Sequence, residues 1–257
     1  MAKKWRGIDV SYSQGKINWS KAKQQISFAF IRMGYIGNSE TLNVDSQYEK
    51  NVSECERLNI PYGIYVYSYA TSVKAVQRAM PFVIKRLKNK HPTLPIYLDL
   101  EESRISQTGM SNVLAMAKTF AEEIEKNGYM YGTYANLNWF NTVLTNSWYQ
   151  TKSIWIAQYY SKCTYSKKYE VWQYSSNGKI AGIEGNVDLN YMYKSPIIGD
   201  VDGDGNVTAK DAREVLRASA KLDNLTAHQK ARADVDKDGK ITSADAREIL
   251  KDSANLK

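Results

Sequence analysis

The sequence lacks features that mark several large classes of protein. No run of about 18 apolar residues occurs in the chain, so no membrane-spanning helix is predicted. The chain has only two cysteines, Cys55 and Cys163, which lie far apart in the sequence. A single disulfide and two reduced thiols are equally good interpretations. No zinc-finger, homeodomain or RNP-like pattern is present, which argues against a nucleic-acid-binding protein.

The composition is that of a folded chain with an uneven charge. At 257 residues, with 43% hydrophobic and 24% charged residues, the chain suits one large and one small globular domain. Residues 1–196 hold 24 Lys and Arg against 15 Asp and Glu, an excess of 9 positive charges, whereas the remainder holds 11 against 12. A basic large domain favours a polyanionic partner such as a bacterial wall polymer, and ordinary solubilising charge is an equally good interpretation.

A twelve-residue pattern typical of a calcium loop occurs twice near the carboxyl terminus. In each copy carboxylates fall at loop positions one, three, five and twelve, a glycine at position six and a β-branched residue at position eight. A similar helix-like segment follows each loop, which indicates a duplication. We predict two structural calcium ions and no cofactor for catalysis. The expected ligand positions are Asp200, Asp202, Asp204, Asn206, Thr208 and Asp211, then Asp234, Asp236, Asp238, Lys240, Thr242 and Asp245.

The duplicated segment, residues 199–257, resembles a type I dockerin. The resemblance implies a small all-α module with two EF-hand-like loops that binds a cohesin domain on a scaffold protein. A calcium sensor is the alternative, but sensor loops usually end in Glu, whereas both loops here end in Asp. Because dockerins act outside the cell, we expect a secreted or cell-surface, scaffold-associated bacterial protein, although residues 1–6 lack the apolar core of a signal peptide.

Residues 1–194 alternate strand-like apolar segments with amphipathic helix-like segments, which favours a parallel sheet covered by helices. The last three strand candidates are separated by gaps too short for covering helices. We therefore predict an α/β fold, a modified TIM-like β/α barrel with eight strands and about five helices, and a short linker at residues 195–198. The strand candidates are residues 7–11, 28–35, 62–69, 96–100, 130–134, 154–158, 169–173 and 186–190.

Four acidic residues, Asp9, Asp99, Glu101 and Asp188, fall on these strands near their ends, where barrel enzymes carry their active sites. Asp99 and Glu101 are two positions apart on an extended segment and should point the same way. Neighbouring carboxyl groups push their proton affinities apart, so one can act as an acid while the other stays ionised. Glycoside hydrolysis requires this division. The alternative, pairing with Lys or Arg, is disfavoured by the gathering of four acids at three strands.

Aromatic residues follow the same strand ends. Flat rings with a polar edge suit the faces and hydroxyl groups of sugars, although any one ring is more often part of a core. As a set beside the acidic residues they predict a saccharide-binding groove. Its members are Tyr35, Tyr67, Tyr69, Tyr134, Trp155 and Trp172.

These blocks resemble glycoside hydrolase family 25, the Chalaropsis-type lysozymes. The similarity runs from residue 5 to residue 193 in the family's order. It includes Gly-Ile-Asp-Val-Ser around Asp9, Pro-Ile-Tyr-Leu-Asp-Leu-Glu ending at Glu101, and Val-Asp-Leu-Asn around Asp188. The resemblance implies an incomplete β/α barrel that hydrolyses the β-1,4 bond between N-acetylmuramic acid and N-acetylglucosamine in peptidoglycan. We expect it to act as a monomer.

The resemblance also implies a role for each acidic residue. Glu101 would be the general acid and base, and Asp99 would orient the substrate's 2-acetamido group or act as the nucleophile. Asp9 and Asp188 would shape the electrostatics of the site and bind substrate. The alternatives are a chitinase-like or other N-acetylhexosamine glycosidase and a non-catalytic wall-binding module. The longer Asp-x-x-Asp-x-Asp-x-Glu run of chitinases is absent, and the intact acid set argues against a non-catalytic module.

Overall fold

The structure, a computed structural model, describes residues 4–37 and 41–255 and divides into two compact units. The large unit spans Arg6–Met192, and the small unit begins at Tyr193. Within the described ranges no helix is long and apolar enough to cross a bilayer.

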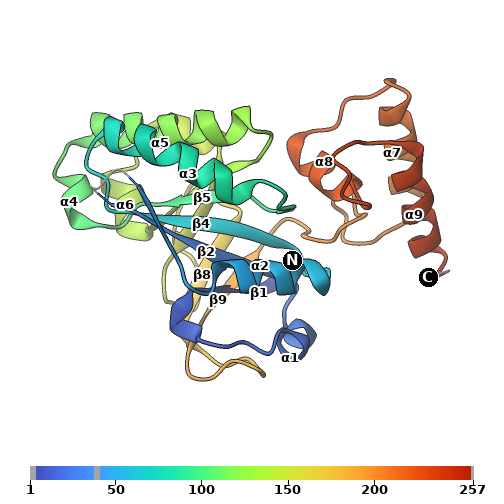
Figure 1. Cartoon of the computed structure of the whole chain (residues 1–257), viewed down its shortest axis with the longest axis horizontal. Helices are drawn as coiled ribbons and strands as arrows, with labels where there is room; N and C mark the ends of the chain where they lie inside the picture. Colours follow the sequence, from blue (N-terminus) through green and yellow to red (C-terminus); the bar gives the residue numbers. More distant parts are fainter. Residues whose placement is uncertain (1–3, 38–40, 256–257) are drawn as a thin grey trace. The chain divides into compact units, whose positions relative to one another are not determined.

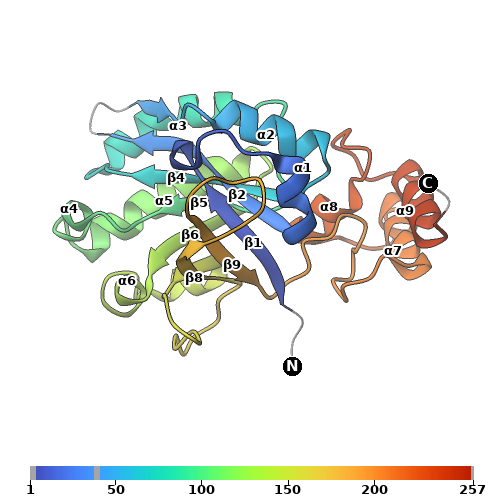
Figure 2. The ribbon, with the colours of Figure 1, turned by 90° about the horizontal axis from the view of Figure 1, so that it is seen from below.

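Eight strands of the large unit close into a barrel, as predicted. In Figure 2, β1 (Trp5–Val10) runs between β2 (Phe28–Ile36) and β9 (Val187–Met192), and these two pairings complete the ring. A short strand, β3 (Leu42–Val44), pairs antiparallel with the far end of β2. The other barrel strands are β4 (Tyr62–Ser68), β5 (Ile96–Asp99), β6 (Tyr131–Asn136), β7 (Ser153–Ala157) and β8 (Val171–Gly178).

The last strand departs from the expected parallel order. β9 pairs antiparallel with β8, with Asn190 opposite Gln173. Residues 179–186, which join the two strands, are too few for a helical crossover, so the chain turns back on itself. The start of β9 therefore lies at the end of the barrel where the parallel strands finish.

Helices cover the barrel incompletely, as predicted. α3 (Val73–Leu87) and α5 (Met110–Lys126) lie side by side in Figure 1, and α2 (Tyr48–Arg57) packs against β2. Ser72 caps α3 by accepting the backbone N–H of Ala75, and Val76 and Val83 are buried at helical spacing. The remaining helices are short: α1 (Trp19–Ala22), α4 (Ser103–Ser106), α6 (Leu137–Thr142) and the 3₁₀ segments η1 (Tyr12–Gln14), η2 (Lys23–Gln25) and η3 (Ser147–Thr151).

Aromatic rings fill the interior of the barrel. The ring of Phe30 lies 4.4 Å from that of Trp155 and 5.1 Å from that of Tyr97, measured between centroids. Glycines make room for these rings, since a Cβ on Gly63 would come within 2.7 Å of Phe30 and one on Gly132 would collide with Tyr97. This close packing makes the interior of the barrel rigid beneath the acidic residues.

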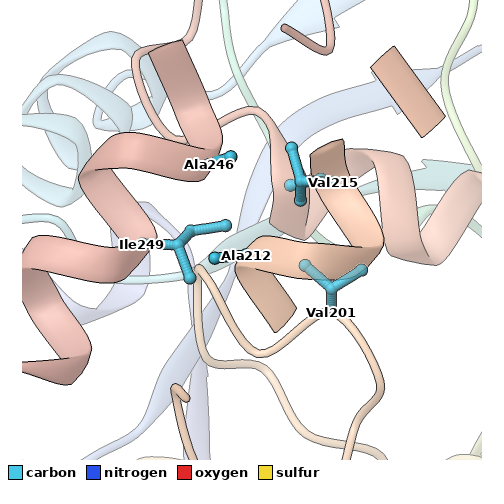
Figure 3. Close-up of a cluster of buried hydrophobic side chains, with 6 residues drawn as sticks. Val201, Ala212, Val215, Ala246 and Ile249 are labelled. Carbon is cyan, nitrogen blue, oxygen red and sulfur yellow. The ribbon is translucent and has the colours of Figure 1, made fainter. Parts of the chain in front are cut away.

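The small unit is built from the duplicated segment. Its helices are α7 (Ala209–Ser219), α8 (Ala227–Ala233) and α9 (Ser243–Ser253), and α7 packs against α9. Thr208 and Asp211 form a capping box on α7, and Thr242 and Asp245 form the same box on α9. Figure 3 shows the core between these helices, which consists of Val201, Ala212, Val215, Ala233, Ala246 and Ile249.

The segment predicted as a linker, residues 195–198, is tied to the small unit. The guanidinium of Arg232 donates hydrogen bonds to the backbone carbonyls of Ser195 and Val201, at 3.2 and 3.0 Å. The two cysteines are both free: Cys55 is buried in α2 and Cys163 is partly buried in the loop after β7.

Candidate active site

The structure brings the four predicted acidic residues to one end of the barrel. Asp9 lies near the end of β1, Asp99 is the last residue of β5, and Glu101 follows two positions later. Asp188 is the second residue of β9. Because β9 runs backwards, its start lies beside the carboxyl ends of the other strands, where (β/α) barrels place their catalytic groups.

These side chains are desolvated and act on one another. Asp9 and Asp99 are each only 4% exposed, whereas Glu101 and Asp188 are partly exposed. Burial, followed by the negative charges of Asp188 and Glu102, raises the pKa of Glu101 above its ordinary value. A partly exposed carboxylic acid that keeps its proton is suited to general acid catalysis.

Asp99 is held in a similar environment. Burial raises its pKa well above the ordinary value, and the charges of Glu101 and Asp9 add to the effect, while Arg32 opposes it. The buried Oδ1 atom of Asp99 has no hydrogen-bond partner in the described part of the chain. Such an atom is costly unless a ligand group satisfies it, which makes Asp99 a candidate contact for a substrate N–H.

A second pair of acidic residues, Asp9 and Asp188, lies beside Asp99 and Glu101. Burial is the largest cause that raises the pKa of all four groups. Burial and then the charge of Asp188 raise the pKa of Asp9 well above its ordinary value, while hydrogen bonds from Asn190 and Gln173 oppose this rise. Burial also raises the pKa of Asp188, and a hydrogen bond to Asp9 opposes it. One proton shared by two carboxyl groups is the expected state of such a pair.

Two amides that the sequence analysis did not single out hold Asp9 in place. The Oδ2 atom of Asp9 accepts hydrogen bonds from Gln173 Nε2 at 2.9 Å and from Asn190 Nδ2 at 2.7 Å. Gln173 ends the strand candidate 169–173, and Asn190 ends the Val-Asp-Leu-Asn motif. Asn190 shares the inward face of β9 with Asp188 because the two are two positions apart. Strand alternation was therefore a signal that could have found Asn190.

Arg32 of β2, which the sequence analysis did not single out, supplies a positive charge to the barrel mouth. Arg32 Nε donates to Asp45 Oδ2 at 2.7 Å, and the Arg32 guanidinium lies 4.7 Å from the ring centre of Tyr12. Asp45 also accepts the backbone N–H groups of Tyr12 and Gln47. This cluster ties together the segments that follow β1 and β3. Its residues could not be recognised from local sequence, because they meet only across the mouth.

Three of the predicted substrate-binding tyrosines form one cluster. Tyr69 lies 5.4 Å from Tyr35 and 4.7 Å from Tyr67 between ring centres. Tyr35 is 39% exposed, and the pKa of Tyr67 is raised by burial and then by the charges of Glu101 and Asp99. The cluster thus extends from the acidic residues toward solvent and presents aromatic surface where a sugar chain can reach it.

The other three predicted aromatic residues are buried and offer no open face. Trp155 is 1% exposed among the interior rings, and its indole N–H donates to Asn190 Oδ1 at 2.8 Å. Tyr134 is 6% exposed and donates its hydroxyl to Gln173. Trp172 lies on the face of β8 opposite Gln173 and packs against Tyr174 and Tyr191. This placement does not support direct contact between Trp172 and a sugar in the mouth.

The loop after β7 contributes a residue that the sequence analysis missed. Tyr159 is 56% exposed, yet its hydroxyl donates to Gln173 Oε1 at 3.1 Å. Its pKa is raised by burial of the hydroxyl and then by the charges of Asp188, Asp9 and Glu101. Tyr159 therefore stands at the rim of the acidic cluster with one face of its ring open.

The calcium loops of the small unit gather oxygen atoms as predicted. Carboxylate oxygens of Asp200, Asp202 and Asp204 lie within 4.8 Å of one another, as do those of Asp234, Asp236 and Asp245. In the second loop Asp234 Oδ1 is buried without a partner in the described chain, and its carboxylate neighbours raise the pKa of Asp234 after burial does. An unsatisfied oxygen among like charges fits a hard divalent cation.

Residues 8–183 match the family model for glycosyl hydrolases family 25. The chain belongs to this family. Residues 198–252 match the type I dockerin domain, a module that binds calcium. The first match lies within the large unit and the second within the small unit. Both matches agree with the fold and with the two resemblances drawn from the sequence.

Two curated relatives of this glycosyl hydrolase are named lysozymes. Lysozyme M1 of Streptomyces globisporus is 28% identical over 200 residues, which cover 72% of this chain and 66% of the relative. The autolytic lysozyme of Clostridium acetobutylicum is 23% identical over 232 residues, which cover 86% and 68%. The chain thus spans about two thirds of the length of these relatives.

Solved structures confirm the barrel. The modular autolysin LytC of Streptococcus pneumoniae superposes with a TM-score of 0.66 at 25% identity, over 73% of this chain and 46% of LytC. A bacterial lysozyme of Streptomyces coelicolor gives a TM-score of 0.61 at 24% identity, over 73% and 91%.

Proposed function

We propose that this family 25 hydrolase is an N-acetylmuramidase that cleaves the β-1,4 bond between N-acetylmuramic acid and N-acetylglucosamine. The observation that carries the proposal is the pairing of a partly exposed Glu101, whose pKa is raised, with a buried Asp99 that has an unsatisfied oxygen. Hydrolysis of an N-acetylhexosamine with help from its own acetamido group uses a proton donor and a residue that orients that group.

In the proposed mechanism Glu101 protonates the glycosidic oxygen as the bond to the sugar lengthens. The positive charge that develops at the sugar is met by the substrate's own acetamido oxygen, while Asp99 holds the acetamido N–H. Glu101, now ionised, takes a proton from a water molecule whose oxygen attacks the anomeric carbon. The bond from that carbon to the acetamido oxygen breaks, which restores the acetamido group and completes the hydrolysis. Tyr35, Tyr67 and Tyr69 would line the path of the glycan.

We further propose that the dockerin attaches the enzyme to a cohesin domain of a scaffold protein outside the cell. Calcium supplies the positive charge that lets the acidic loops pack. Asp200, Asp202 and Asp204 would hold one ion and Asp234, Asp236 and Asp245 the other, with the remaining loop positions completing each site. Metal binding would then contribute directly to the folding of this small module.

Digestion of purified peptidoglycan tests the proposed bond. The new reducing ends, identified by mass spectrometry after borohydride reduction, should be N-acetylmuramic acid. Reducing N-acetylglucosamine would indicate a glucosaminidase, and released stem peptides an amidase. Chitin should be hydrolysed much more slowly because it lacks the lactyl group and peptide, and equal rates on the two polymers would favour a chitinase.

A further inference from the structure

Arg32 lies beside the groups that the proposed mechanism uses, yet that mechanism gives it no role. We propose that Arg32 selects N-acetylmuramic acid over N-acetylglucosamine in the subsite where Asp99 holds the acetamido group. It does so by donating hydrogen bonds to the carbonyl of the lactyl group on O3 of that sugar. The inference rests on the proposed muramidase function and names the residue that recognises the group by which the substrate differs from chitin.

The strands place Arg32 and Asp99 in one layer of the barrel. Arg32 lies two positions beyond Phe30 on β2, and Asp99 lies two positions beyond Tyr97 on β5. Side chains two positions apart on a strand share a face, and the rings of Phe30 and Tyr97 meet in the interior with centres 5.1 Å apart. Arg32 and Asp99 therefore both face the interior one layer above these touching rings, at the mouth.

Two neighbours fix the guanidinium of Arg32 and leave its outer edge for a ligand. Its Nε donates to Asp45 Oδ2 at 2.7 Å, and its central carbon lies 4.7 Å from the ring centre of Tyr12. The Arg32 side chain is still 21% exposed. Within residues 4–37 and 41–255 its two Nη groups donate no hydrogen bond. A guanidinium held in this way suits a planar carbonyl or carboxylate acceptor.

The order of the side chains matches the order of groups on the sugar. Burial and then the charge of Glu101 raise the pKa of Asp99, and the charge of Arg32 opposes that rise, whereas Arg32 does not act on Glu101. Asp99 thus stands between the other two. On the sugar, C2 with its acetamido group stands between C1, where Glu101 protonates the glycosidic oxygen, and C3, which carries the lactyl ether. A sugar with its acetamido N–H on Asp99 places the lactyl carbonyl toward Arg32.

Ligand binding by full-length protein that carries Glu101→Gln tests this selectivity without turnover. Isothermal titration calorimetry compares chitotetraose with a tetrasaccharide of alternating N-acetylglucosamine and peptide-bearing N-acetylmuramic acid. We expect Arg32→Met to weaken binding of the muramyl ligand by roughly 10- to 100-fold, the usual effect of losing a hydrogen bond from a charged group. Binding of chitotetraose should stay nearly unchanged. An equal loss for both ligands would overturn the proposal, because it would show a general disturbance of the site.

A muramyl tetrasaccharide stripped of its peptides by an amidase separates the lactyl group from the peptide. This ligand keeps the lactyl carbonyl as part of a carboxylate, so Arg32→Met should weaken its binding at least as much. If only the peptide-bearing ligand is affected, Arg32 contacts the peptide and the lactyl assignment is wrong. Failure of the muramidase proposal would appear separately, as reducing ends other than N-acetylmuramic acid released by the natural protein.

Arg32→Lys covers the case in which loss of Arg32 disturbs the fold. Lysine keeps a positive charge beside Asp45, whose carboxylate also accepts the backbone N–H groups of Tyr12 and Gln47. It has no planar fork that can bind Asp45 and the lactyl carbonyl at once. We expect a melting temperature close to that of the natural protein and loss of most of the preference for the muramyl ligand. Full preference in this variant would overturn the role of the Nη groups.

Arg104→Met is the matched control. Arg104 also lies over a tyrosine of the mouth, 5.7 Å from the ring centre of Tyr69, and also pairs with a carboxylate, that of Glu102 at 3.2 Å. Its charge is not among those that act on Asp99. The control should change the affinity for muramyl and chitin ligands alike. A loss confined to the muramyl ligand in Arg104→Met, with none in Arg32→Met, would move the contact to Arg104 and overturn the proposal.

Discussion

Asn190 Nδ2 donates a hydrogen bond of 2.7 Å to Asp9 Oδ2 and thereby joins residues 181 positions apart in the chain. The bond crosses the seam where β9 meets β1, at which the barrel closes. The acidic cluster is therefore complete only when the barrel is closed. A substitution that disrupts the contact between β9 and β1 should lower both the stability of the fold and the activity.

Glu101→Gln should lower kcat on peptidoglycan by about 10²–10⁴-fold or more, because the amide keeps the shape of the side chain but has no proton to give. The measurement is release of reducing ends, with circular dichroism to show that the fold is retained. Glu102→Gln is the matched control: Glu102 pairs with Arg104 at 3.2 Å and should retain most of the activity. Near-normal turnover by the Glu101 variant would refute the assignment.

Asp99→Asn should be nearly inactive yet more stable than the natural protein at neutral pH. Burial raises the pKa of Asp99 well above 3.8, so the folded state binds its proton more tightly than the unfolded state. Ionisation of the unfolded state then costs stability as pH rises above 3.8, and below that pH both states are protonated and the cost disappears. Thermal melts should show a gain in Tm at pH 7 that vanishes at low pH; an equal gain at all pH values would contradict this cause.

Asp188→Asn should move the basic limb of the kcat/KM profile to lower pH. The negative charge of Asp188 disfavours ionisation of Glu101, so its removal lowers the pKa of the general acid, which then loses its proton sooner as pH rises. The pH dependence of initial rates on soluble wall fragments provides the measurement. A basic limb that stays in place would mean that Glu101 does not sense Asp188.

Chelation of calcium should unfold the dockerin but spare hydrolysis of soluble substrates. The clustered carboxylates repel one another without a cation, and the apolar core of the small unit is only a few side chains. Limited proteolysis in EDTA should cut within residues 199–257 and leave the barrel intact. If EDTA abolishes hydrolysis and calcium restores it, the two units are not independent in function.

The helices that follow the two calcium loops, α7 and α9, should offer a cohesin two related binding faces. Leu216 and Leu250 stand at equivalent positions of α7 and α9, and each is 42% exposed. Arg217 and Lys251 follow them, paired with Asp223 and Glu248 respectively. In a binding assay with cohesins from the same source, Arg217→Asp and Lys251→Asp should each weaken binding mildly and the double variant strongly.

Lys230→Asp, which reverses an exposed charge on α8, controls for charge alone in that assay. A strong effect of one single variant and none of the other would show that the dockerin binds the cohesin in one orientation only. The two copies differ at loop position eleven, which is Lys210 in the first and Ala244 in the second, so their binding faces are not identical. If no cohesin binds the calcium-loaded natural protein, the proposed attachment fails.

Local patterns in the sequence were sufficient to predict where the barrel strands, the calcium loops and the cluster of acidic residues lie in the chain. A few consecutive apolar residues predict a strand, and carboxylates at set positions within twelve residues predict a calcium loop. Both patterns can therefore be recognised from residues that are close together in the sequence. Asp99 and Glu101 were found for the same reason. The alternation of an extended segment directs both side chains to the same side, at the end of a predicted strand.

The tertiary structure alone decided which groups meet. The reversal of β9 depends on the packing of the last hairpin, and it brings Asp188 to Asp9 and Asn190 to Trp155. The register of β7 and β8 pairs Trp155 with Val171 and Trp172 with Ile156. Trp155 and Trp172, which look alike as strand-end aromatics, therefore fall on the inside and the outside of the barrel. Contacts between residues that are far apart in the chain form only when the ring closes, because each strand must then present one face to a shared interior.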